Sequence, residues 1–229
     1  MHSFNKYFVK LIRKFKRREW FIIKSILIYI IFVSNLFSQS IIGEWKALTS
    51  TLSINQSETI NSIIYSATSG GLLIRDGDSF STFTKIDGIE NIDIKSIGKD
   101  SLDNLWLGGG SPDGSIQIFN PIKKKSIQEF KFSLTEITDI CISDTIAFCA
   151  YIDGQDIGIL KFVLENEEWQ YYDSFRNFPQ SIISINDILL INDMLLIGTN
   201  IGVLFGKLNS NLKSPNEWNL FNSSFDGPV

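Results

Sequence analysis

The chain has 229 residues, of which 44% are hydrophobic and 20% charged, and its formal net charge is −4 at pH 7. This composition is ordinary for a packed globular protein and excludes disorder as the state of the whole chain. The length allows one all-β domain or slightly more.

The first forty residues have the order of a secretory signal peptide. Eight basic residues lie within Lys6–Lys24, and thirteen uncharged, mostly apolar residues follow over Ser25–Phe37. The small or polar residues Ser38-Gln39-Ser40 come next, as at a cleavage site. A signal anchor is the alternative, but the apolar run is shorter than the ~20 residues that cross a bilayer. We expect 1–40 to be a cleaved signal peptide and 41–229 an exported domain without a membrane span.

Cleavage would change the charge of the protein. Removing the segment takes away eight basic residues and one acidic residue, which leaves 13 basic and 24 acidic residues and a net charge near −11. An acidic surface disfavours nucleic acid and anionic membranes as partners. The only histidine, His2, leaves with the segment. Serine–histidine and cysteine–histidine catalytic arrangements and histidine metal sites are therefore excluded from the exported part.

A short pattern recurs through the rest of the chain: an apolar strand, a small residue, glycine, and a second alternating strand. The small residue stands at the same point of each copy, and successive copies are 41, 41 and 49 residues apart. Periods of about 40 to 50 residues made of short strands are typical of β-propeller blades. The small residues of the four copies are Ala67, Gly108, Cys149 and Gly198.

Each copy divides into four strands, innermost first, and together they predict an all-β propeller with four blades of four antiparallel strands. The first two blades are predicted over Leu52–Ser57, Ser62–Thr68, Gly71–Arg75 and Phe80–Lys85, then Ile94–Lys99, Leu105–Gly108, Ser115–Phe119 and Ser126–Phe132. The other two are predicted over Ile137–Ile142, Thr145–Tyr151, Gly158–Phe162 and Trp169–Tyr172, then Ser184–Ile191, Met194–Thr199, Gly202–Gly206 and Glu217–Phe221. No segment after residue 40 has a convincing helical period.

Turn chemistry fits between these strands. The three glycines Gly108–Gly110 after an apolar strand predict a tight hairpin. Asp-Gly steps favour positive φ at a turn. They occur at Asp76-Gly77, Asp87-Gly88, Asp113-Gly114, Asp153-Gly154 and Asp226-Gly227.

One outer-type strand has no blade of its own. Trp45–Leu48 resembles the aromatic outer strands at Trp169 and Trp218 but precedes the first complete unit. We therefore expect 41–229 to be the N-terminal part of a larger ring. An open or four-bladed ring with a loose first strand is the alternative.

The opening of the exported part resembles the PorZ family, exported β-propeller proteins of the type IX secretion system. The resemblance rests on Ile42-Gly43-Glu44-Trp45-Lys46, on Ile64–Thr68 with Gly71-Leu72, and on Phe83–Ile89. The opening and the Lys85–Ile89 passage are its more specific parts, while the repeat motifs are generic among propellers. Asn104–Gly108 and Leu196–Gly202 also look like the two-component regulator propeller repeat.

The PorZ resemblance implies a non-enzymatic binding or scaffold module in the periplasm or at the cell surface, associated with the outer membrane. It implies partnership with the sortase or secretion machinery, or with a surface glycan or lipopolysaccharide. The repeat resemblance implies the alternative, a periplasmic sensor. PorZ-like proteins carry two propellers and a C-terminal β domain, of which only part of the first is present, and the matching motifs transfer no ligand contacts.

Several residue groups could carry chemistry, and each also has a structural interpretation. Cys141 and Cys149 lie on adjacent predicted strands, where a disulfide is possible but two small buried thiols are favoured. Asp100–Asn104 and Asp76–Asp78 hold clustered oxygen ligands for calcium, although neither completes a calcium loop and both are better explained as turns.

The remaining groups are surface tips. Glu165, Glu167 and Glu168 fit a solvated hairpin tip, and Lys123–Lys125 a basic one too small for nucleic acid. Gly108–Gly110 lacks the following lysine and helix of a phosphate loop. The sequence thus predicts no catalytic, cofactor-binding or metal-binding residue and no cofactor, and it places binding in the loops at the mouth of the ring.

Overall fold

A computed structural model describes residues 22, 29, 48–110, 113–179 and 182–221. The chain divides into two compact units, Met1–Lys46 and Ala47–Val229. The predicted signal peptide lies outside the described residues except for Ile22 and Tyr29, and so does the Asp226-Gly227 turn. Of the orphan strand predicted over Trp45–Leu48, only Leu48 is described, and it is exposed and belongs to no strand. Within the described residues, no helix has the length and apolar character that spanning a membrane requires.

The described part of the second unit forms four separate antiparallel sheets of four strands, each in chain order from its first to its fourth strand. Sheets 1 and 2 consist of β1 (Ile54–Ile60), β2 (Ile63–Thr68), β3 (Gly71–Asp76) and β4 (Ser79–Phe83), then β5 (Ile94–Lys99), β6 (Leu105–Gly109), β7 (Ser115–Asn120) and β8 (Lys125–Lys131). Sheets 3 and 4 consist of β9 (Glu136–Ser143), β10 (Ile146–Asp153), β11 (Asp156–Glu165) and β12 (Glu168–Phe175), then β13 (Ile185–Ile191), β14 (Met194–Thr199), β15 (Gly202–Lys207) and β16 (Asn219–Leu220).

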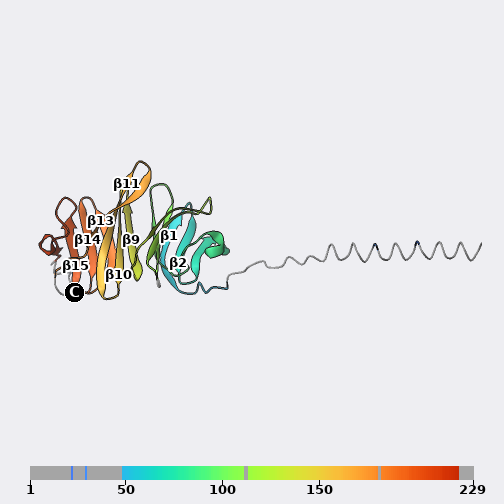
Figure 1. Cartoon of the computed structure of the whole chain (residues 1–229), viewed down its shortest axis with the longest axis horizontal. Helices are drawn as coiled ribbons and strands as arrows, with labels where there is room; N and C mark the ends of the chain where they lie inside the picture. The colour runs from blue at the N-terminus through green and yellow to red at the C-terminus, as the bar shows by residue number, and fades with distance from the viewer. Residues whose placement is uncertain (1–21, 23–28, 30–47, 111–112, 180–181, 222–229) are drawn as a thin grey trace, which may run out of the picture. The chain divides into compact units, whose positions relative to one another are not determined.

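The first strands of the sheets line up in chain order: β1 packs on β5, β5 on β9, and β9 on β13. Figure 1 shows β1, β9 and β13 following one another in this order. This arrangement confirms the predicted propeller fold with four blades. The ring is not closed within the described residues. Two short 3₁₀ helices, η1 (Lys85–Asp87) and η2 (Pro215–Glu217), are the only helices described in this unit, in agreement with the missing helical period.

Strand ends differ from the prediction mainly in the outer halves of sheets 3 and 4. The strands of the β11–β12 hairpin are longer than predicted and run up to a two-residue turn. Asn166 and Glu167, with φ of 51° and 68°, form this turn. It projects from the molecule in Figure 1. In sheet 4 the last strand is shorter than predicted. Its predicted first residue, Glu217, belongs instead to η2, which begins at Pro215.

Each first strand carries a one-residue bulge, at Asn55, Lys95, Thr138 and Asn186 respectively. The residue after each bulge faces a small residue on the second strand, in the pairs Gln56–Ala67, Ser96–Gly108, Asp139–Ala150 and Asp187–Gly198. The small residue of the third copy is therefore Ala150, and the sequence-based choice of Cys149 was wrong by one position. The steps become 41, 42 and 48 residues.

The hairpin predicted at the glycine run after Leu107 is confirmed, since β6 pairs antiparallel with β7. Gly108 and Gly109 belong to β6, and neither lies in the left-handed region. A Cβ atom added to Gly108 would stand 2.1 Å from the Ser96 hydroxyl and 2.8 Å from the Ile137 side chain of sheet 3. Glycine is needed here because sheet 3 approaches the backbone closely.

The Asp-Gly turns are confirmed at three places. Gly77, Gly88 and Gly154 have φ of 57°, 91° and 65°. Gly114 does not have positive φ, contrary to the prediction; its N–H instead donates to the Leu134 carbonyl at 2.8 Å.

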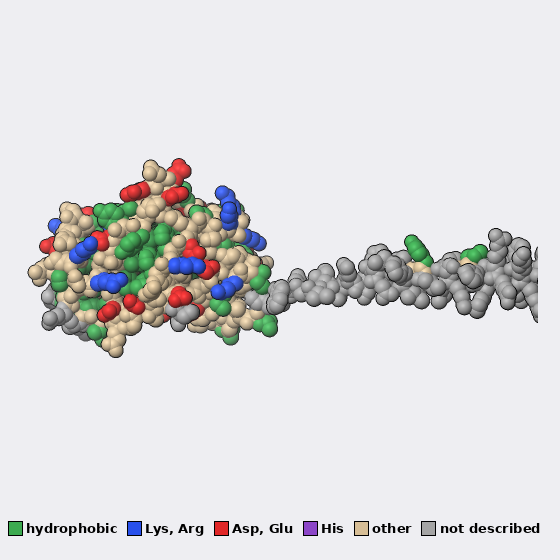
Figure 2. All heavy atoms as spheres, in the orientation of Figure 1, with side chains coloured by type: hydrophobic (Ala, Val, Ile, Leu, Met, Phe, Trp, Pro, Cys, Tyr) green, Lys and Arg blue, Asp and Glu red, His purple; other side chains and the backbone are tan. Residues whose placement is uncertain are grey.

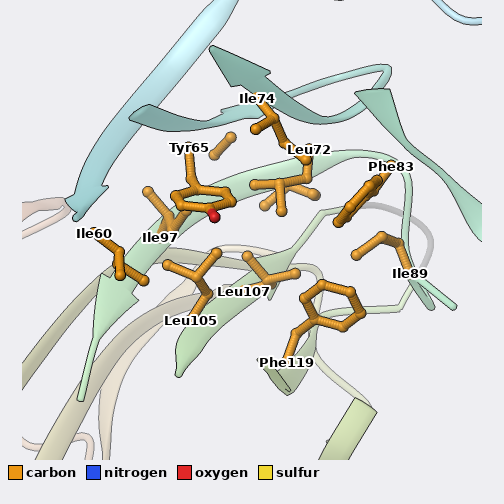
Figure 3. Packing of buried hydrophobic residues seen from close by; sticks show 12 residues of the cluster. Ile60, Tyr65, Leu72, Ile74, Phe83, Ile89, Ile97, Leu105, Leu107 and Phe119 are labelled. Atoms are coloured by element: carbon orange, nitrogen blue, oxygen red, sulfur yellow. The ribbon is translucent and has the colours of Figure 1, made fainter. Parts of the chain in front are cut away.

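Three apolar clusters fill the spaces between consecutive sheets. In the first, Tyr65, Leu72 and Phe83 of sheet 1 project toward Leu105 and Leu107 of sheet 2 (Figure 3). The second joins sheets 2 and 3 around Trp106, Phe162 and Trp169, and the third joins sheets 3 and 4 around Phe148, Ile197 and Trp218. Burial of each such side chain stabilises the fold by roughly 1.5–3 kcal/mol, so the interfaces between sheets supply most of the hydrophobic stabilisation.

A buried polar chain connects the first strands. Gln56 Oε1 accepts the N–H of Ile97 at 2.9 Å, and Gln56 Nε2 donates to Asp139 Oδ1 at 2.8 Å. The other oxygen of Asp139 accepts the N–H of Ile188 at 2.7 Å. Two side chains thus join all four sheets, and Asp139 is only 3% exposed.

We expect Gln56→Ala to lower the free energy of unfolding by about 1–3 kcal/mol, because it leaves a buried N–H and a buried carboxylate oxygen unpaired. The measurement is urea denaturation of the full chain. Gln170→Ala, at an exposed position of β12, is the control and should change stability by no more than ~0.5 kcal/mol. Equal effects of the two substitutions would contradict the role given to Gln56.

Candidate functional site

The topology gathers the connections between sheets at one end of the strands. In each sheet, the fourth strand ends at the same end as the turn between the second and third strands. The first strand of the following sheet begins at that end too. We call this end the connector face. Its described residues are 69–70, 84–93, 110, 113–114, 132–135, 154–155, 176–179, 182–184 and 200–201.

The first hollow of the connector face lies beside the connection from sheet 1 to sheet 2 and has a volume of about 370 Å³. Its rim is held by side-chain hydrogen bonds: Gln117 of β7 accepts the Glu90 N–H at 3.0 Å and donates to the Gly88 carbonyl at 2.7 Å. Asn91 donates to the Gly110 carbonyl at 2.9 Å. The lining residues are Lys85, Glu90, Asn91, Asp113, Gly114, Ser115, Lys131, Phe132 and Ser133.

Charge at this hollow is arranged around Lys131. Its ammonium group lies 2.9 Å from Glu90 and 3.2 Å from Glu129. The hydrogen bond and charge of Lys131 lower the pKa of the Glu90 carboxyl, and the hydrogen bonds to the two acids raise the pKa of Lys131. Exposed pairs of this kind contribute little to stability. The groups stay accessible to a charged or polar ligand.

The second hollow lies beside the connection from sheet 3 to sheet 4 and measures about 380 Å³. Phe178 packs on Trp218 with 5.3 Å between ring centroids, and Asn177 donates to the Lys213 carbonyl at 3.2 Å. Arg176 stands 5.6 Å over the ring of Tyr151. The lining residues are Gln155, Asp156, Ile157, Arg176, Asn177, Phe178, Pro179 and Ile182.

Tyr151 lies under Arg176 and belongs to the apolar cluster between sheets 2 and 3. Its ring lies over Gly158, where an added Cβ atom would meet the ring at 2.3 Å. The Tyr151 hydroxyl is buried beside the Arg176 side chain. Burial raises the pKa of Tyr151, an effect that the nearby Arg176 charge partly offsets.

The acidic residues closest to a catalytic or metal-binding arrangement are Asp139 and Asp187. Burial is the main cause of the raised pKa of Asp139, and a hydrogen bond with Asp187 acts in the same direction. Both oxygens of Asp139 already accept hydrogen bonds from Gln56 and Ile188. Across the described ranges no group of three or more acidic, cysteine or histidine residues is placed to hold a metal ion. The pair is a structural contact between sheets.

The two cysteines are free. Cys141 is paired with Phe148 across β9 and β10, and Cys149 with Ile140, so the two side chains point to opposite faces of the sheet. Cys149 packs between sheets 2 and 3, and Cys141 between sheets 3 and 4. The interpretation as two packed thiols is confirmed.

The turn interpretation of Asp100–Asn104 is also confirmed. The Asp100 carboxylate accepts the N–H groups of Leu102 and Asn104 at 2.9 Å and the Asn104 side-chain amide at 3.1 Å. These bonds hold the β5–β6 turn. Asp76–Asp78 likewise forms the β3–β4 turn, where Arg75 donates to the Gly77 carbonyl at 3.1 Å.

The charged tips lie at the opposite end from the connector face. Glu165, Glu167 and Glu168 stand exposed at the end of the β11–β12 hairpin, where acidic side chains gather in Figure 2. A shallow hollow runs along this hairpin beside Tyr171 and Tyr172. Lys123–Lys125 forms the β7–β8 turn, and the Lys124 ammonium group covers the ring of Phe83 at 5.1 Å.

Sequence reasoning located binding in the loops but gave a binding role to none of the residues that line the two hollows. Lys85, Glu90 and Lys131 lie in or beside connections that follow no repeat, so no recurring pattern marked them. The one signal for these residues in the sequence was the Phe83–Ile89 passage of the PorZ resemblance, which contains Lys85 of the first hollow.

No protein-family model matches the chain, and no curated protein matches it. Among solved structures, the chain is similar to PorZ, a bacterial surface component of the type-IX secretion system of Porphyromonas gingivalis, with a TM-score of 0.53, 17% identity, and coverage of 78% of this chain and 24% of that one. It is also similar to the extracellular domain assigned to a hybrid two-component system of B. thetaiotaomicron, with a TM-score of 0.52, 20% identity, and coverage of 66% and 21%.

A β-propeller domain from Myceliophteria thermophila matches with a TM-score of 0.52 and 12% identity over 64% of this chain and 52% of that one. Identities this low show a shared fold alone. The resemblance inferred from the sequence is thereby confirmed for the propeller fold. The chain spans about a quarter or less of the two bacterial structures.

The Asp139–Asp187 contact predicts a pH dependence of stability. Because the pKa of Asp139 is raised in the folded state, its contribution is present below the unfolded pKa and is lost as pH rises through the folded value. In Asp187→Asn the new amide donates to the Asp139 carboxylate, so this loss should become smaller. The measurement is urea denaturation between ~pH 4 and ~pH 8. Asp144→Asn, in the exposed β9–β10 turn, is the charge-matched control; parallel profiles of the two variants would refute the assignment.

The cysteine geometry predicts that native chain incubated with oxidised glutathione forms no Cys141–Cys149 disulfide. Burial raises the pKa of both thiols, that of Cys149 well above its usual value, which adds to the unfavourable geometry. Intact mass under non-reducing conditions is the readout. The same chain unfolded in denaturant should form the disulfide, and its appearance in the native chain would mean that the two strands pair differently.

Proposed function

We propose that this chain is an exported, non-enzymatic propeller module that binds a partner on the connector face. The observation that carries the proposal is the contrast between the two ends of the strands. The opposite end consists mainly of short turns, and its hollow of about 550 Å³ lies along the single β11–β12 hairpin. The connector face instead combines long irregular connections with two hollows of about 370 and 380 Å³, each lined by more than one segment of the chain. Concave loop regions on a rigid scaffold are the common place for ligand binding.

The composition of the hollows favours binding over catalysis. The first hollow presents ammonium, carboxylate, amide and hydroxyl groups beside the ring of Phe132, a mixture suited to a polar surface or a glycan. Its Lys131 and Glu90 are exposed and paired with each other. Catalytic acids and bases instead depend on strongly perturbed pKa values in sheltered sites.

The finer proposal is a periplasmic or cell-surface role in type IX secretion, together with the sortase or another part of the machinery, or with surface lipopolysaccharide. Its support is the fold likeness to PorZ, which is a surface component of that system, and the resemblance of the segments around residues 42–46 and 83–89. The second candidate is a periplasmic sensor propeller. It is favoured by the fold likeness to the extracellular domain of a hybrid two-component system.

Deleting the gene in the bacterium that carries it separates these roles. The secretion role predicts that cargo proteins disappear from the cell surface, as measured by proteomics of the intact-cell surface. The sensor role predicts a lost transcriptional response with normal surface cargo.

Complementation then tests the connector face. Lys85→Glu with Lys131→Glu reverses two charges in the first hollow, and Lys123→Glu with Lys125→Glu makes the same charge change at the β7–β8 turn. At equal protein levels, the first variant should fail to restore surface cargo and the second should restore it. Restoration by both variants would remove the first hollow from the proposed function.

A further inference from the structure

The side of sheet 4 that faces away from sheet 3 is apolar and exposed. We call it the outward face of sheet 4. Leu189, Val203 and Phe221 on this side are 50%, 39% and 57% exposed, and Ile191 is 42% exposed. Leu189, Leu196 and Phe205 stand in one row across β13, β14 and β15. A soluble surface rarely leaves such a row of large apolar side chains uncovered.

The same positions are buried in the other three sheets. Counted from the bulge, Leu196 corresponds to Tyr65, Trp106 and Phe148, which are 4%, 0% and 0% exposed. Val203 corresponds to Leu72, Ile116 and Ile159, each 0% exposed. Phe221, which donates its N–H to the Val203 carbonyl, stands where Phe83, Phe130 and Phe175 stand in sheets 1 to 3.

In sheets 1 to 3 these positions form the side that packs on the following sheet. Tyr65, Leu72, Ile74 and Phe83 are the residues of sheet 1 that meet sheet 2 in Figure 3. The outward face of sheet 4 therefore has the residues of an interface between sheets, but none of the described residues forms a sheet that packs on it.

Two smaller features of sheet 4 fit the same interface. Gly198 retains the small residue of the repeat, although an added Cβ atom would meet only Asp187, at 3.5 Å. At the equivalent Gly108 the added atom would collide with Ile137 of the next sheet. Asp187 follows the bulge of its sheet, as Gln56 and Asp139 do in theirs. In those two sheets the side chain at this position accepts a backbone N–H of the following sheet.

The structure argues against a second copy of this chain as the occupant. The side of each sheet that receives its predecessor carries an apolar cross-strand pair: Ile97–Leu107, Ile140–Cys149 and Ile188–Ile197. In sheet 1 this pair is Ser57–Ser66, whose hydroxyls share a hydrogen bond of 2.7 Å. A second copy would thus offer hydroxyl groups to an apolar surface.

We propose that the outward face of sheet 4 binds a fifth four-stranded sheet of the same repeat, whose facing side carries an aliphatic pair at the positions of Ile188 and Ile197. The contact repeats the three interfaces between the sheets described above. It is a separate surface from the connector face and does not depend on the ligand bound there.

The test extends the full chain by repeating residues 176–221 directly after Phe221, so that the appended sheet offers the Ile188–Ile197 pair to the original sheet 4. Val203→Cys in the original sheet reports access through its alkylation rate, located by mass spectrometry. The extension should slow alkylation about tenfold or more, because a closed interface opens rarely. The matched control carries Ile188→Ser and Ile197→Ser in the appended copy only, and should alkylate as fast as the unextended chain.

Equal rates with and without the extension, with the appended sheet folded by circular dichroism, would overturn the proposal. So would an unextended chain that is already protected and dimeric in analytical ultracentrifugation, since a second copy would then be the occupant.

A pair of single variants tests the open face without any extension. Val203→Lys should leave the denaturation midpoint of the chain unchanged, whereas Ile159→Lys, at the equivalent but covered position of sheet 3, should prevent folding. Unfolding by Val203→Lys would show that the face is already covered and would also overturn the proposal.

Discussion

The arrangement of the four sheets depends on the contact between Gln56 and Asp139. Through this pair, sheet 1 is joined to the backbone of sheet 2 and sheet 3 to the backbone of sheet 4. Apolar packing between sheets is strong but tolerates sliding, whereas hydrogen bonds made away from water are directional and costly to leave unmade. The apolar clusters supply the stability, and the polar chain fixes how far each sheet is rotated from its neighbour.

Both residues can make these contacts because of the bulges that precede them. A bulge adds one residue to the first strand and turns the next side chain toward the neighbouring sheet. The opposite residue must then be small, which explains Ala67, Gly108, Ala150 and Gly198. The recurring small residue is thus the only feature of the sequence that indicates the contact between the side chain after the bulge and the neighbouring sheet.

Much of the fold could be predicted from the sequence because local patterns determine it. Alternating apolar residues and Asp-Gly turns located all sixteen described strands to within a few residues. The register was harder: Ala150 and Cys149 are both small and buried, and only pairing with Asp139 distinguishes them. The reason for glycine at position 108 was not predictable, because composition does not reveal that Ile137 approaches from another sheet. The hollows were not predictable, since they combine residues from connections far apart in the chain, such as Lys85 and Lys131.

The stacking of the sheets has a direction, because the two sides of each sheet differ. Each interface joins one side of a sheet, with a large residue on the second strand, to an apolar pair on the next sheet. Because the two sides differ, sheets add in one order only. Because each sheet has four antiparallel strands, the chain leaves every sheet at the end where it entered. The hydroxyl pair Ser57–Ser66 interrupts this series at sheet 1, while sheet 4 continues it with Leu196 and Val203. The strand number therefore decides at which end the irregular connections gather, and packing in one order places them side by side, with the hollows of the connector face between them.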